Sequence, residues 1–242
     1  MSRKDTAASF IAKSTIKAAD LEHRRKINFN INKYNTVVPQ GKQQFGNKVM
    51  PAREKAKNRK WDAIEHLDRY LEEFEQKITS RGAKVIWAEN AHEALEAIGK
   101  ICKEKDCKTL VKSKSMVTEE IHLNHYLLSI GVDSVETDLG EYIQQLDGEA
   151  PYHIVTPAMH KSKEDVARLF ADKLGTPSGL SPEELTLVAR KILRNKYVEA
   201  EVGITGANFI VADVGGIAVT ENEGNARLSC SWPKTHFVVV GI

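Results

Sequence analysis

Apolar residues at helical spacing dominate the first eighty positions of the chain. Over residues 6–34 they recur at roughly helical spacing, which predicts a helix. Apolar residues that recur every three or four positions predict a second helix over 51–80. Arg81-Gly82 would end it, since a glycine commonly follows the last helical turn. Residues 36–51 between them carry proline, two glycines and few apolar anchors. We therefore expect a loop or tether across a surface there.

Beyond residue 80, short apolar runs alternate with amphipathic segments. A short apolar run covers 83–88; the predicted strands are 109–111, 132–136 and 152–155, and the predicted helices are 91–102, 116–130, 139–146, 163–173 and 182–197. The last of these helices has a capping signature, with Ser181 as the cap, Pro182 at the first position and Glu184 three residues after the cap. This alternation favours a mainly parallel sheet with helices on both faces.

The pattern changes near the end of the sequence. Three apolar runs, 209–212, 216–220 and 236–241, follow one another without long helices between them. A tight-turn sequence at 213–216 predicts that the first two form an antiparallel hairpin, which would make the sheet mixed at that side. The last run reaches Ile242 with no polar tail or closing helix, so we expect the natural protein to continue further.

These elements together predict a three-layer α/β/α sandwich. Its mainly parallel sheet, mixed at one edge, would occupy residues 51–242, preceded by a basic helical arm and tether over residues 1–50. Charge divides the chain in a similar place. Residues 1–60 hold 15 lysines and arginines against 4 carboxylates, a net charge of +11, and the remainder holds 20 against 29, a net charge of −9.

A basic arm on an acidic body is typical of proteins that bind nucleic acid, an anionic membrane or an acidic partner. The basic residues are not interleaved with aromatic residues and no nucleic-acid-binding motif follows, so an acidic protein surface is favoured over nucleic acid.

No apolar run approaches the ~20 residues that span a bilayer. There is also no secretory signal at the start, and the three cysteines form neither a disulfide framework nor a metal-ligand pattern. We expect a cytoplasmic protein without a metal site in this sequence.

Polar residues follow the first two predicted strands at the point where each strand ends. In open α/β sheets, ligands bind beyond the carboxyl ends of the strands. After strand 109–111, two lysines and two serines begin a helix, where free N–H groups also favour an anion; alternatively, Ser115 only caps the helix and the lysines are solvated. Carboxylates within 136–141 could likewise cap the next helix or bind a polar ligand. The candidate ligand-binding residues of these segments are Lys112, Ser113, Lys114, Ser115, Asp138 and Glu141.

A third polar segment, residues 220–227, directly follows the apolar run at 216–219. Its crowded hydrogen-bonding groups suit a functional loop and an ordinary Asx turn about equally. A glycine-spaced turn at 203–208 precedes its strand and is therefore no dinucleotide fingerprint. The candidate ligand-binding residues of these two segments are Thr205, Asn208, Thr220, Asn222, Gly224, Asn225 and Arg227.

Three residues are candidates for acid–base catalysis. Glu221 and Glu223 lie in the segment 220–227, where they could balance the positive charge of the site or exchange a proton. His122 lies on the predicted helix 116–130 and belongs to the residue type that titrates near neutral pH. A surface or capping role is the alternative for His122.

Five segments, taken in order, resemble one known family. They are residues 61–71, 112–116, 136–141, 203–208 and 220–225, and together they resemble the LUD domain of lactate-utilization iron–sulfur proteins, the B subunits of bacterial L-lactate oxidation complexes, over nearly the whole sequence. The resemblance implies a fold similar to sugar isomerases and CoA-transferases, and electron transfer during oxidation of L-lactate to pyruvate. It also implies the lactate-utilization A and C subunits as partners.

The same resemblance implies where a cofactor would be. Members of the family continue into a ferredoxin-like region with clustered cysteines, whereas this sequence has no C-x₂-C-x₂-C run. The resemblance therefore implies that [4Fe-4S] clusters belong to a C-terminal region outside this sequence, and that this part carries no cofactor of its own.

Three functions remain open at this point. The chain could be the N-terminal LUD portion of an iron–sulfur subunit, binding a small anionic ligand or a partner subunit. It could instead be a self-contained isomerase- or CoA-transferase-like enzyme that uses a loop glutamate. The third alternative is a structural module that docks subunits through its basic arm.

Overall fold

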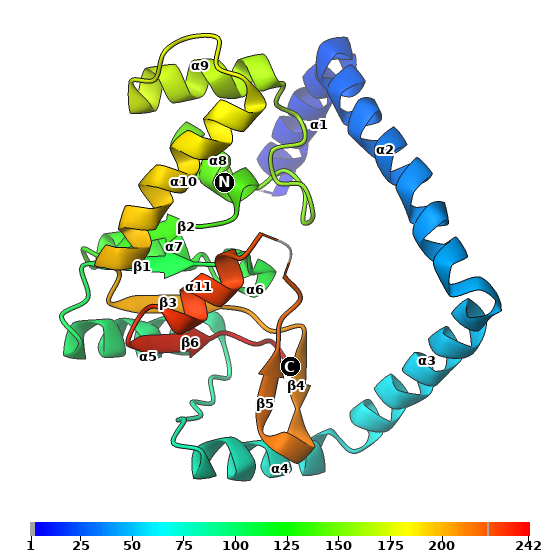
Figure 1. Ribbon diagram of the computed structural model, residues 1–242, viewed down its shortest axis with the longest axis vertical. Coiled ribbons are helices and arrows are strands. Elements are labelled where there is room, and N and C mark those ends of the chain that lie inside the picture. Colours follow the sequence, from blue (N-terminus) through cyan, green and yellow to red (C-terminus); the bar gives the residue numbers. More distant parts are fainter. Residues whose placement is uncertain (1–2, 222) are drawn as a thin grey trace.

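A four-stranded parallel sheet forms the centre of the molecule, and a long helical extension precedes it (Figure 1). The computed structural model describes residues 3–221 and 223–242. The strand order is β2-β1-β3-β6, with β1 at Thr109–Lys112, β2 at Asp133–Glu136, β3 at Val202–Thr205 and β6 at Thr235–Val238. Each neighbouring pair is parallel, so the four carboxyl ends meet at one edge of the sheet. The predicted α/β sandwich with an N-terminal helical extension is confirmed.

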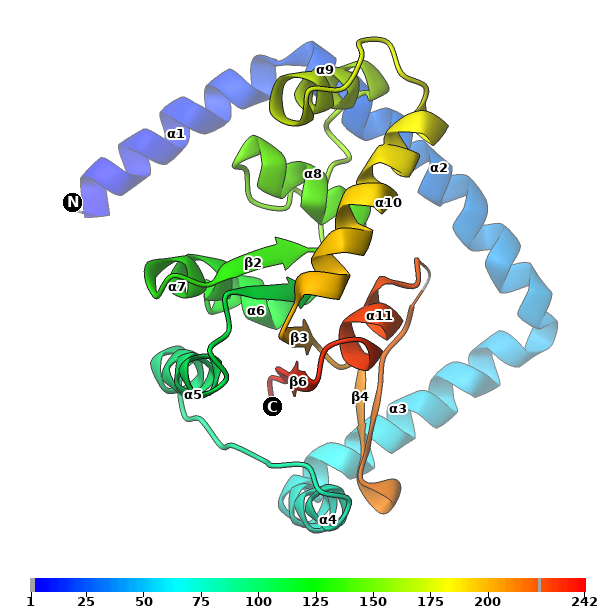
Figure 2. The ribbon, with the colours of Figure 1, turned by 60° about the vertical axis from the view of Figure 1, so that its left-hand side comes forward.

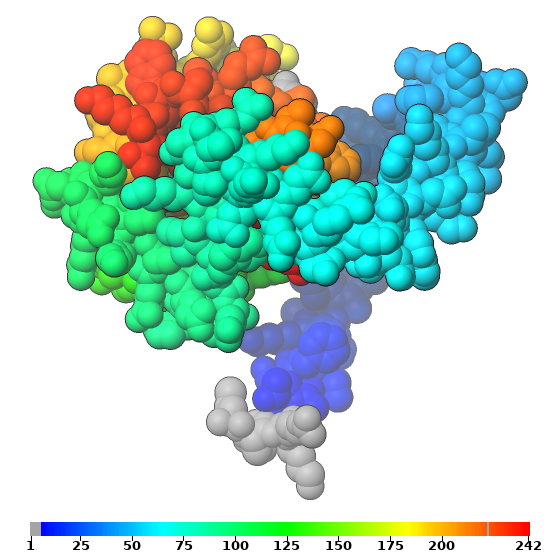
Figure 3. Space-filling model, turned by 90° about the horizontal axis from the view of Figure 1, so that it is seen from below, coloured from blue at the N-terminus to red at the C-terminus, as the bar shows by residue number. Residues whose placement is uncertain are grey.

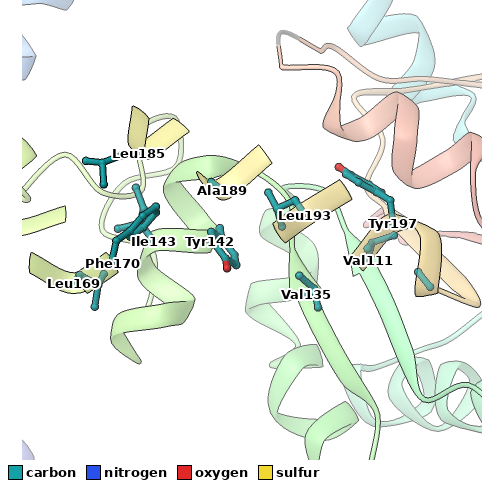
Figure 4. Packing of buried hydrophobic residues seen from close by; sticks show 11 residues of the cluster. Val111, Val135, Tyr142, Ile143, Leu169, Phe170, Leu185, Ala189, Leu193 and Tyr197 are labelled. Carbon is teal, nitrogen blue, oxygen red and sulfur yellow. The ribbon is translucent and has the colours of Figure 1, made fainter. Parts of the chain in front are cut away.

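Helices cover both faces of the sheet because successive strand residues point to opposite sides. Leu110 joins one buried cluster and Val111 the other. The cluster around Leu110 involves α5 (Ala91–Glu104) and α7 (Leu123–Ser129). The cluster around Val111 involves α8 (Leu139–Asp147), α9 (Lys163–Leu174) and α10 (Pro182–Glu199). Figure 4 shows Val111 and Val135 beside Leu193 and Tyr197 of α10.

The N-terminal extension is helical almost throughout, so the loop predicted for 36–51 is wrong. It consists of α1 (Arg3–Ala19), α2 (Leu21–Phe45), a short 3₁₀ turn η1 (Gly46–Lys48), α3 (Val49–Glu65) and α4 (Leu67–Ser80). Pro39 lies inside α2. A proline removes one N–H donor from a helix, and on an exposed helix water can bind the carbonyl left without a donor.

Both long helices predicted in this region are divided in the structure. The Asp20 side chain accepts a hydrogen bond from the N–H of His23 at 2.9 Å and so begins α2 separately from α1. His66 leaves the helical conformation between α3 and α4. Figures 1 and 2 show the extension as an arc from α9, at one end of the body, to the hairpin at the other. Among the described residues, no helix combines the length and the apolarity that crossing a membrane requires.

The predicted hairpin is present, but it stands apart from the main sheet. β4 (Phe209–Val211) pairs antiparallel with β5 (Gly216–Ala218) in a separate two-stranded sheet, so the four-stranded sheet is not mixed at its edge. The tip of the hairpin, η2 (Ala212–Val214), contacts α4 instead, where Lys77 Nζ donates to the carbonyl of Asp213 at 2.7 Å. Gly215 has φ of +59°, and a Cβ there would lie 2.6 Å from Ile78 N. A glycine is therefore required for this contact.

Four further elements differ from the sequence predictions. The segment 152–155 is bent rather than a strand, because the N–H of Val155 binds His153 Nδ1 at 3.1 Å. The predicted helix 116–130 is divided into α6 (Met116–Glu120) and α7, since His122 adopts φ of +55°. A short helix, α11 (Asn225–Ser231), was not predicted. Residues 203–205, taken from the sequence as part of a turn, belong to the interior strand β3.

Candidate functional site

Charged residues end the two neighbouring strands β1 and β2 at the carboxyl edge of the sheet. Lys112 is the last residue of β1 and Glu136 the last residue of β2, and the parallel register places them opposite each other. Both side chains are almost wholly buried. A buried ammonium group requires a nearby negative charge, and here the pairing of the strands supplies it.

Lys112 is the centre of this arrangement, with 0% of its side chain exposed. Its Nζ lies 2.8 Å from Glu136 Oε1 and 3.1 Å from Glu119 Oε1, and it donates to Thr118 Oγ1 at 3.1 Å. Burial opposes the charge on Lys112, but the carboxylates around it, led by Glu136, outweigh burial and raise its pKa. Lys112 is therefore a buried cation held between two carboxylates.

Glu141, on the first turn of α8, adds a third carboxyl group. Neither of its carboxyl oxygens has a hydrogen-bond partner among the described residues, and the same holds for Glu136 Oε2. Burial, and then the charge of Glu136, raise the pKa of Glu141 to about 9. Glu141 therefore carries a proton at neutral pH, and its O–H can donate to Glu136, which two ionised carboxylates cannot do. We call Lys112, Thr118, Glu119, Glu136 and Glu141 the buried ionic cluster.

A second layer of amides holds Glu136 in place. Asn124 Nδ2 donates to Glu136 Oε1 at 2.6 Å, and Asn124 Oδ1 accepts from the hydroxyl of Ser134 at 2.9 Å. The N–H of Glu136 donates to Gln145 Oε1 at 3.0 Å. These contacts join α7, β2 and α8, so the position of the carboxylate facing Lys112 is set by three elements at once.

Beside the buried ionic cluster lies a second, more open group of charges at the start of α8. Asp138 caps α8 by accepting the N–H of Glu141 at 3.1 Å, and its other oxygen lies 3.5 Å from Lys114 Nζ. Glu223 reaches in from the 220–227 segment and accepts the N–H of Leu139 at 3.3 Å. Burial and the charge of Asp138 raise the pKa of Glu223. We call Lys114, Asp138, Leu139 and Glu223 the α8 corner.

Comparison with known proteins identifies the family of the chain. The family model of the LUD domain matches residues 71–242. The chain belongs to the LUD domain family. The resemblance found in the five sequence segments is thereby confirmed.

This LUD domain is similar to curated proteins named Lactate utilization protein B. The protein from Bacillus cytotoxicus is 48% identical over 179 residues, which cover 74% of this chain and 38% of that protein. The protein from Bacillus licheniformis is 47% identical over 180 residues, again 74% of this chain and 38% of that protein. The match thus spans well under half of the length of these relatives. No solved structure matches this chain.

Several other predicted site residues of the LUD domain lie at the same edge of the sheet, where they make structural contacts. The N–H of Ser113 donates to the carbonyl of Ile204 at 2.9 Å, which prolongs the pairing of β1 and β3. Ser115 caps α6, which was the alternative to anion binding in the sequence analysis. Thr205 Oγ1 lies 2.9 Å from His236 Nε2 on the neighbouring strand β6. These residues close the sheet edge around the buried ionic cluster.

Glu221 and Arg227 bind each other within the 220–227 segment, and Thr220 binds outside it. Glu221 Oε1 accepts the N–H of Arg227 at 2.8 Å, and Glu221 Oε2 lies 3.6 Å from Arg227 Nε. Asn208 Oδ1 accepts the N–H of Thr220 at 2.7 Å and so joins the hairpin to this segment. Glu221 and Arg227 therefore hold the segment to the first turn of α11.

The remaining predicted residues lie around this segment or away from it. Gly224 has φ of +82° and directly precedes α11. Asn225 begins that helix, and its carbonyl accepts from the hydroxyl of Tyr197 at 3.3 Å. His122 is exposed at the break between α6 and α7. Asn222 lies outside the residues that the structure describes.

Sequence reasoning missed Glu119, Thr118 and Asn124 as parts of the site, and it placed Glu136 in a polar segment without choosing it as a site residue. A signal for Glu136 was present, because strands β1 and β2 both end in a charged residue and a buried lysine requires a counter-charge. Glu119 and Thr118 carried no such signal, since their position under Lys112 depends on how α6 folds back from β1.

Proposed function

We propose that this chain is the LUD portion of a lactate-utilization B-type protein, an iron–sulfur electron-transfer subunit that takes part in oxidising L-lactate to pyruvate. The similarity to Lactate utilization protein B over 74% of the chain supports this role. In this proposal the protein works in the cytoplasm together with the lactate-utilization A and C subunits.

The iron–sulfur centres of this proposal belong to sequence outside this chain. A [4Fe-4S] cluster is held by four cysteine thiolates. Here Cys102 and Cys107 are buried and Cys230 is exposed, and the chain has three cysteines in all, so its residues do not fit such a cluster. The part played by this LUD domain is therefore binding rather than electron transfer.

The α8 corner is the place that we propose for the ligand. The observation that carries this step is the carboxylate of Glu223, which accepts the N–H of Leu139 at the positive end of α8, beside Lys114. A carboxylate of the chain thus already occupies a position suited to an anion. L-Lactate or a similar small carboxylate would displace Glu223 and bind the same N–H and the same lysine.

Lactate binding to the isolated chain tests this assignment by isothermal titration calorimetry. Lys114→Met is expected to weaken binding about tenfold or more, since a hydrogen bond to a charged group contributes roughly 1.5–3 kcal/mol. Glu223→Gln is expected to strengthen binding, because the competing carboxylate is removed. Lys163→Met, at an exposed lysine on α9, serves as the control and should bind lactate like the unmodified chain. Equal affinity in Lys114→Met and the control would contradict the assignment.

The electron-transfer part of the proposal is tested on the natural full-length protein. After anaerobic reconstitution with iron and sulfide, the full-length protein is expected to show the broad visible absorption of an iron–sulfur protein. The 242-residue chain treated in the same way is expected to show no such absorption. If the full-length protein lacks that absorption, the iron–sulfur assignment is wrong, whatever the result of the lactate titration.

A further inference from the structure

The N-terminal extension contacts the body at both ends, and no residue of its middle is buried. Near its start, Lys26 Nζ lies 2.5 Å from Asp165 Oδ2 and Asn30 Nδ2 donates to the carbonyl of Met159 at 2.9 Å. A polar cavity of about 460 Å³ lies at this junction of α2 and α9. At the other end, α4 is docked on the hairpin tip (Figure 1). Between these points α2 and α3 contain no buried residue.

Helices of this kind depend on packing. Most helical stability in proteins comes from burying an apolar face rather than from intrinsic propensity. The proline and the glycine inside α2, Pro39 and Gly41, lower its propensity further. The exposed span of the extension therefore has the properties of a surface that another polypeptide covers.

Charge is sharply divided about Trp61, where α3 approaches its end. Residues 48–60 contain six cations and one carboxylate, a net charge of +5. Residues 62–75 contain six carboxylates and one cation, a net charge of −5. Two segments of nearly equal length thus carry equal and opposite charge on either side of one residue.

Large apolar side chains are exposed at the same point. Trp61 is 65%, Ile64 69% and Leu67 39% exposed. Figure 3 views the molecule from the side of α3 and α4, drawn in cyan to turquoise, and shows them as an open outer surface. Aromatic and aliphatic anchors surrounded by charges form the usual anatomy of a protein–protein interface.

Many of the charges on this surface are available for a partner. Some of them are used within the helices, as in the pair Lys57–Glu54 and the pair Lys77–Glu73. Others are exposed and have no ion pair within the part of the chain that the structure describes: Arg53, Arg59, Lys60, Glu65, Asp68 and Glu72. Three are basic and precede or adjoin Trp61, and three are acidic and follow it.

We propose that this surface, residues 48–75, is a self-complementary interface through which two copies of the chain form a dimer with two-fold symmetry. In a two-fold interface the same patch serves both partners, and a contact from one residue to another is repeated in reverse. An antiparallel arrangement about Trp61 places the basic segment of each copy against the acidic segment of the other. Trp61, Ile64 and Leu67 then form the apolar centre of the interface.

The division of charge is what favours a second copy over other occupants. An anionic membrane or a nucleic acid would attract residues 48–60 and be repelled by residues 62–75. A purely acidic partner would likewise leave the acidic segment unmatched. A second copy satisfies both segments, because its charges occur in the reverse order along the interface.

Sedimentation velocity of the 242-residue chain in the low-micromolar range tests the proposal. The expected mass is twice the 27.0 kDa of one chain. Two triple variants reverse the unpaired charges, R53E/R59E/K60E on the basic segment and E65K/D68K/E72K on the acidic segment. Each variant alone is expected to sediment as a monomer, because like charges then face each other. An equimolar mixture of the two is expected to recover the dimer, because the charges match again.

The control reverses three exposed cations elsewhere, in R190E/K191E/R194E on α10, and is expected to remain a dimer. A monomeric unmodified chain overturns the proposal, and so does a mixture that stays monomeric while circular dichroism shows both variants folded. Lactate takes no part in these measurements, so their result tests the dimer independently of the proposed function.

Discussion

Lys112→Met is expected to lower the free energy of unfolding by about 3–5 kcal/mol, the usual cost of removing one partner from a buried ion pair. Methionine has nearly the length of lysine and leaves little cavity. It also leaves Glu136, 4% exposed, without its cation at 2.8 Å, and Glu119 without its cation at 3.1 Å. The decrease in the free energy of unfolding therefore comes from the uncompensated carboxylates rather than from lost packing volume.

Urea denaturation followed by circular dichroism measures this loss. Lys114→Met is the matched control, since Lys114 is partly exposed and its Nζ lies 3.5 Å from Asp138 Oδ2; this change should cost less than about 1 kcal/mol. The double variant Lys112→Met/Glu136→Gln should recover part of the stability, because both charges of the closest pair are then absent. Similar losses in the two single variants would show that Lys112 is not held as a buried cation.

Glu141→Gln is expected to stabilise the protein increasingly as pH rises from about 5 to 9. The pKa of Glu141 is about 9 in the folded protein, above its ordinary value of 4.5. Between these values the folded state keeps a proton that the unfolded chain releases, so the stability of the unmodified protein falls with rising pH by up to about 1.4 kcal/mol per pH unit. Glutamine does not ionise, so the stability of the Glu141→Gln variant does not fall with rising pH for this reason.

Urea denaturation at pH 5, 7 and 8 measures the difference in free energy of unfolding between the two proteins. The difference should be small at pH 5 and reach several kcal/mol at pH 8. Glu120→Gln, at an exposed glutamate on α6, is the control and should show no such trend. A difference that stays constant across the three pH values would mean that Glu141 is not the group that holds the proton.

The elements that local sequence determines were predicted well. The Ser181 capping box at the start of α10 is present, with Ser181 Oγ accepting the N–H of Glu184 and Glu184 accepting the N–H of Ser181. The hairpin from β4 to β5 followed from its turn residues. Its separation from the main sheet did not, because the contact of its tip with α4 joins Lys77 to Asp213, 136 residues apart, and leaves no local trace.

The extension and β3 show where local signals mislead. Pro39 and Gly41 are ordinary turn residues, yet α2 continues through both. Gly203 made β3 look like a turn, whereas a Cβ there would lie 1.8 Å from the carbonyl oxygen of Ser229, so this glycine permits α11 to pack on the strand. In both cases glycine or proline was interpreted as the sign of a loop or turn, whereas the residue lies in a helix or a strand.

The candidate site was predicted in part. Lys112, Lys114, Asp138 and Glu141 were expected beyond the carboxyl ends of the strands, and the parallel sheet brings them there. Glu223 reaches the same place through Leu139. The burial of Lys112 and the proton on Glu141 could not be predicted, because both depend on how many elements enclose that edge, which the spacing of residues along the chain does not reveal.

The strand order has a consequence for the sequence of events during folding. Every member of the buried ionic cluster comes from one continuous stretch, Lys112 to Glu141, so its ion pairs can assemble as soon as β1 and β2 have paired. β3, which flanks β1 on its other side, arrives from Val202, far later in the chain. A ribosome-bound chain can thus neutralise the lysine while water still surrounds it, and desolvation of the completed ion pair follows only when the last strands close the sheet.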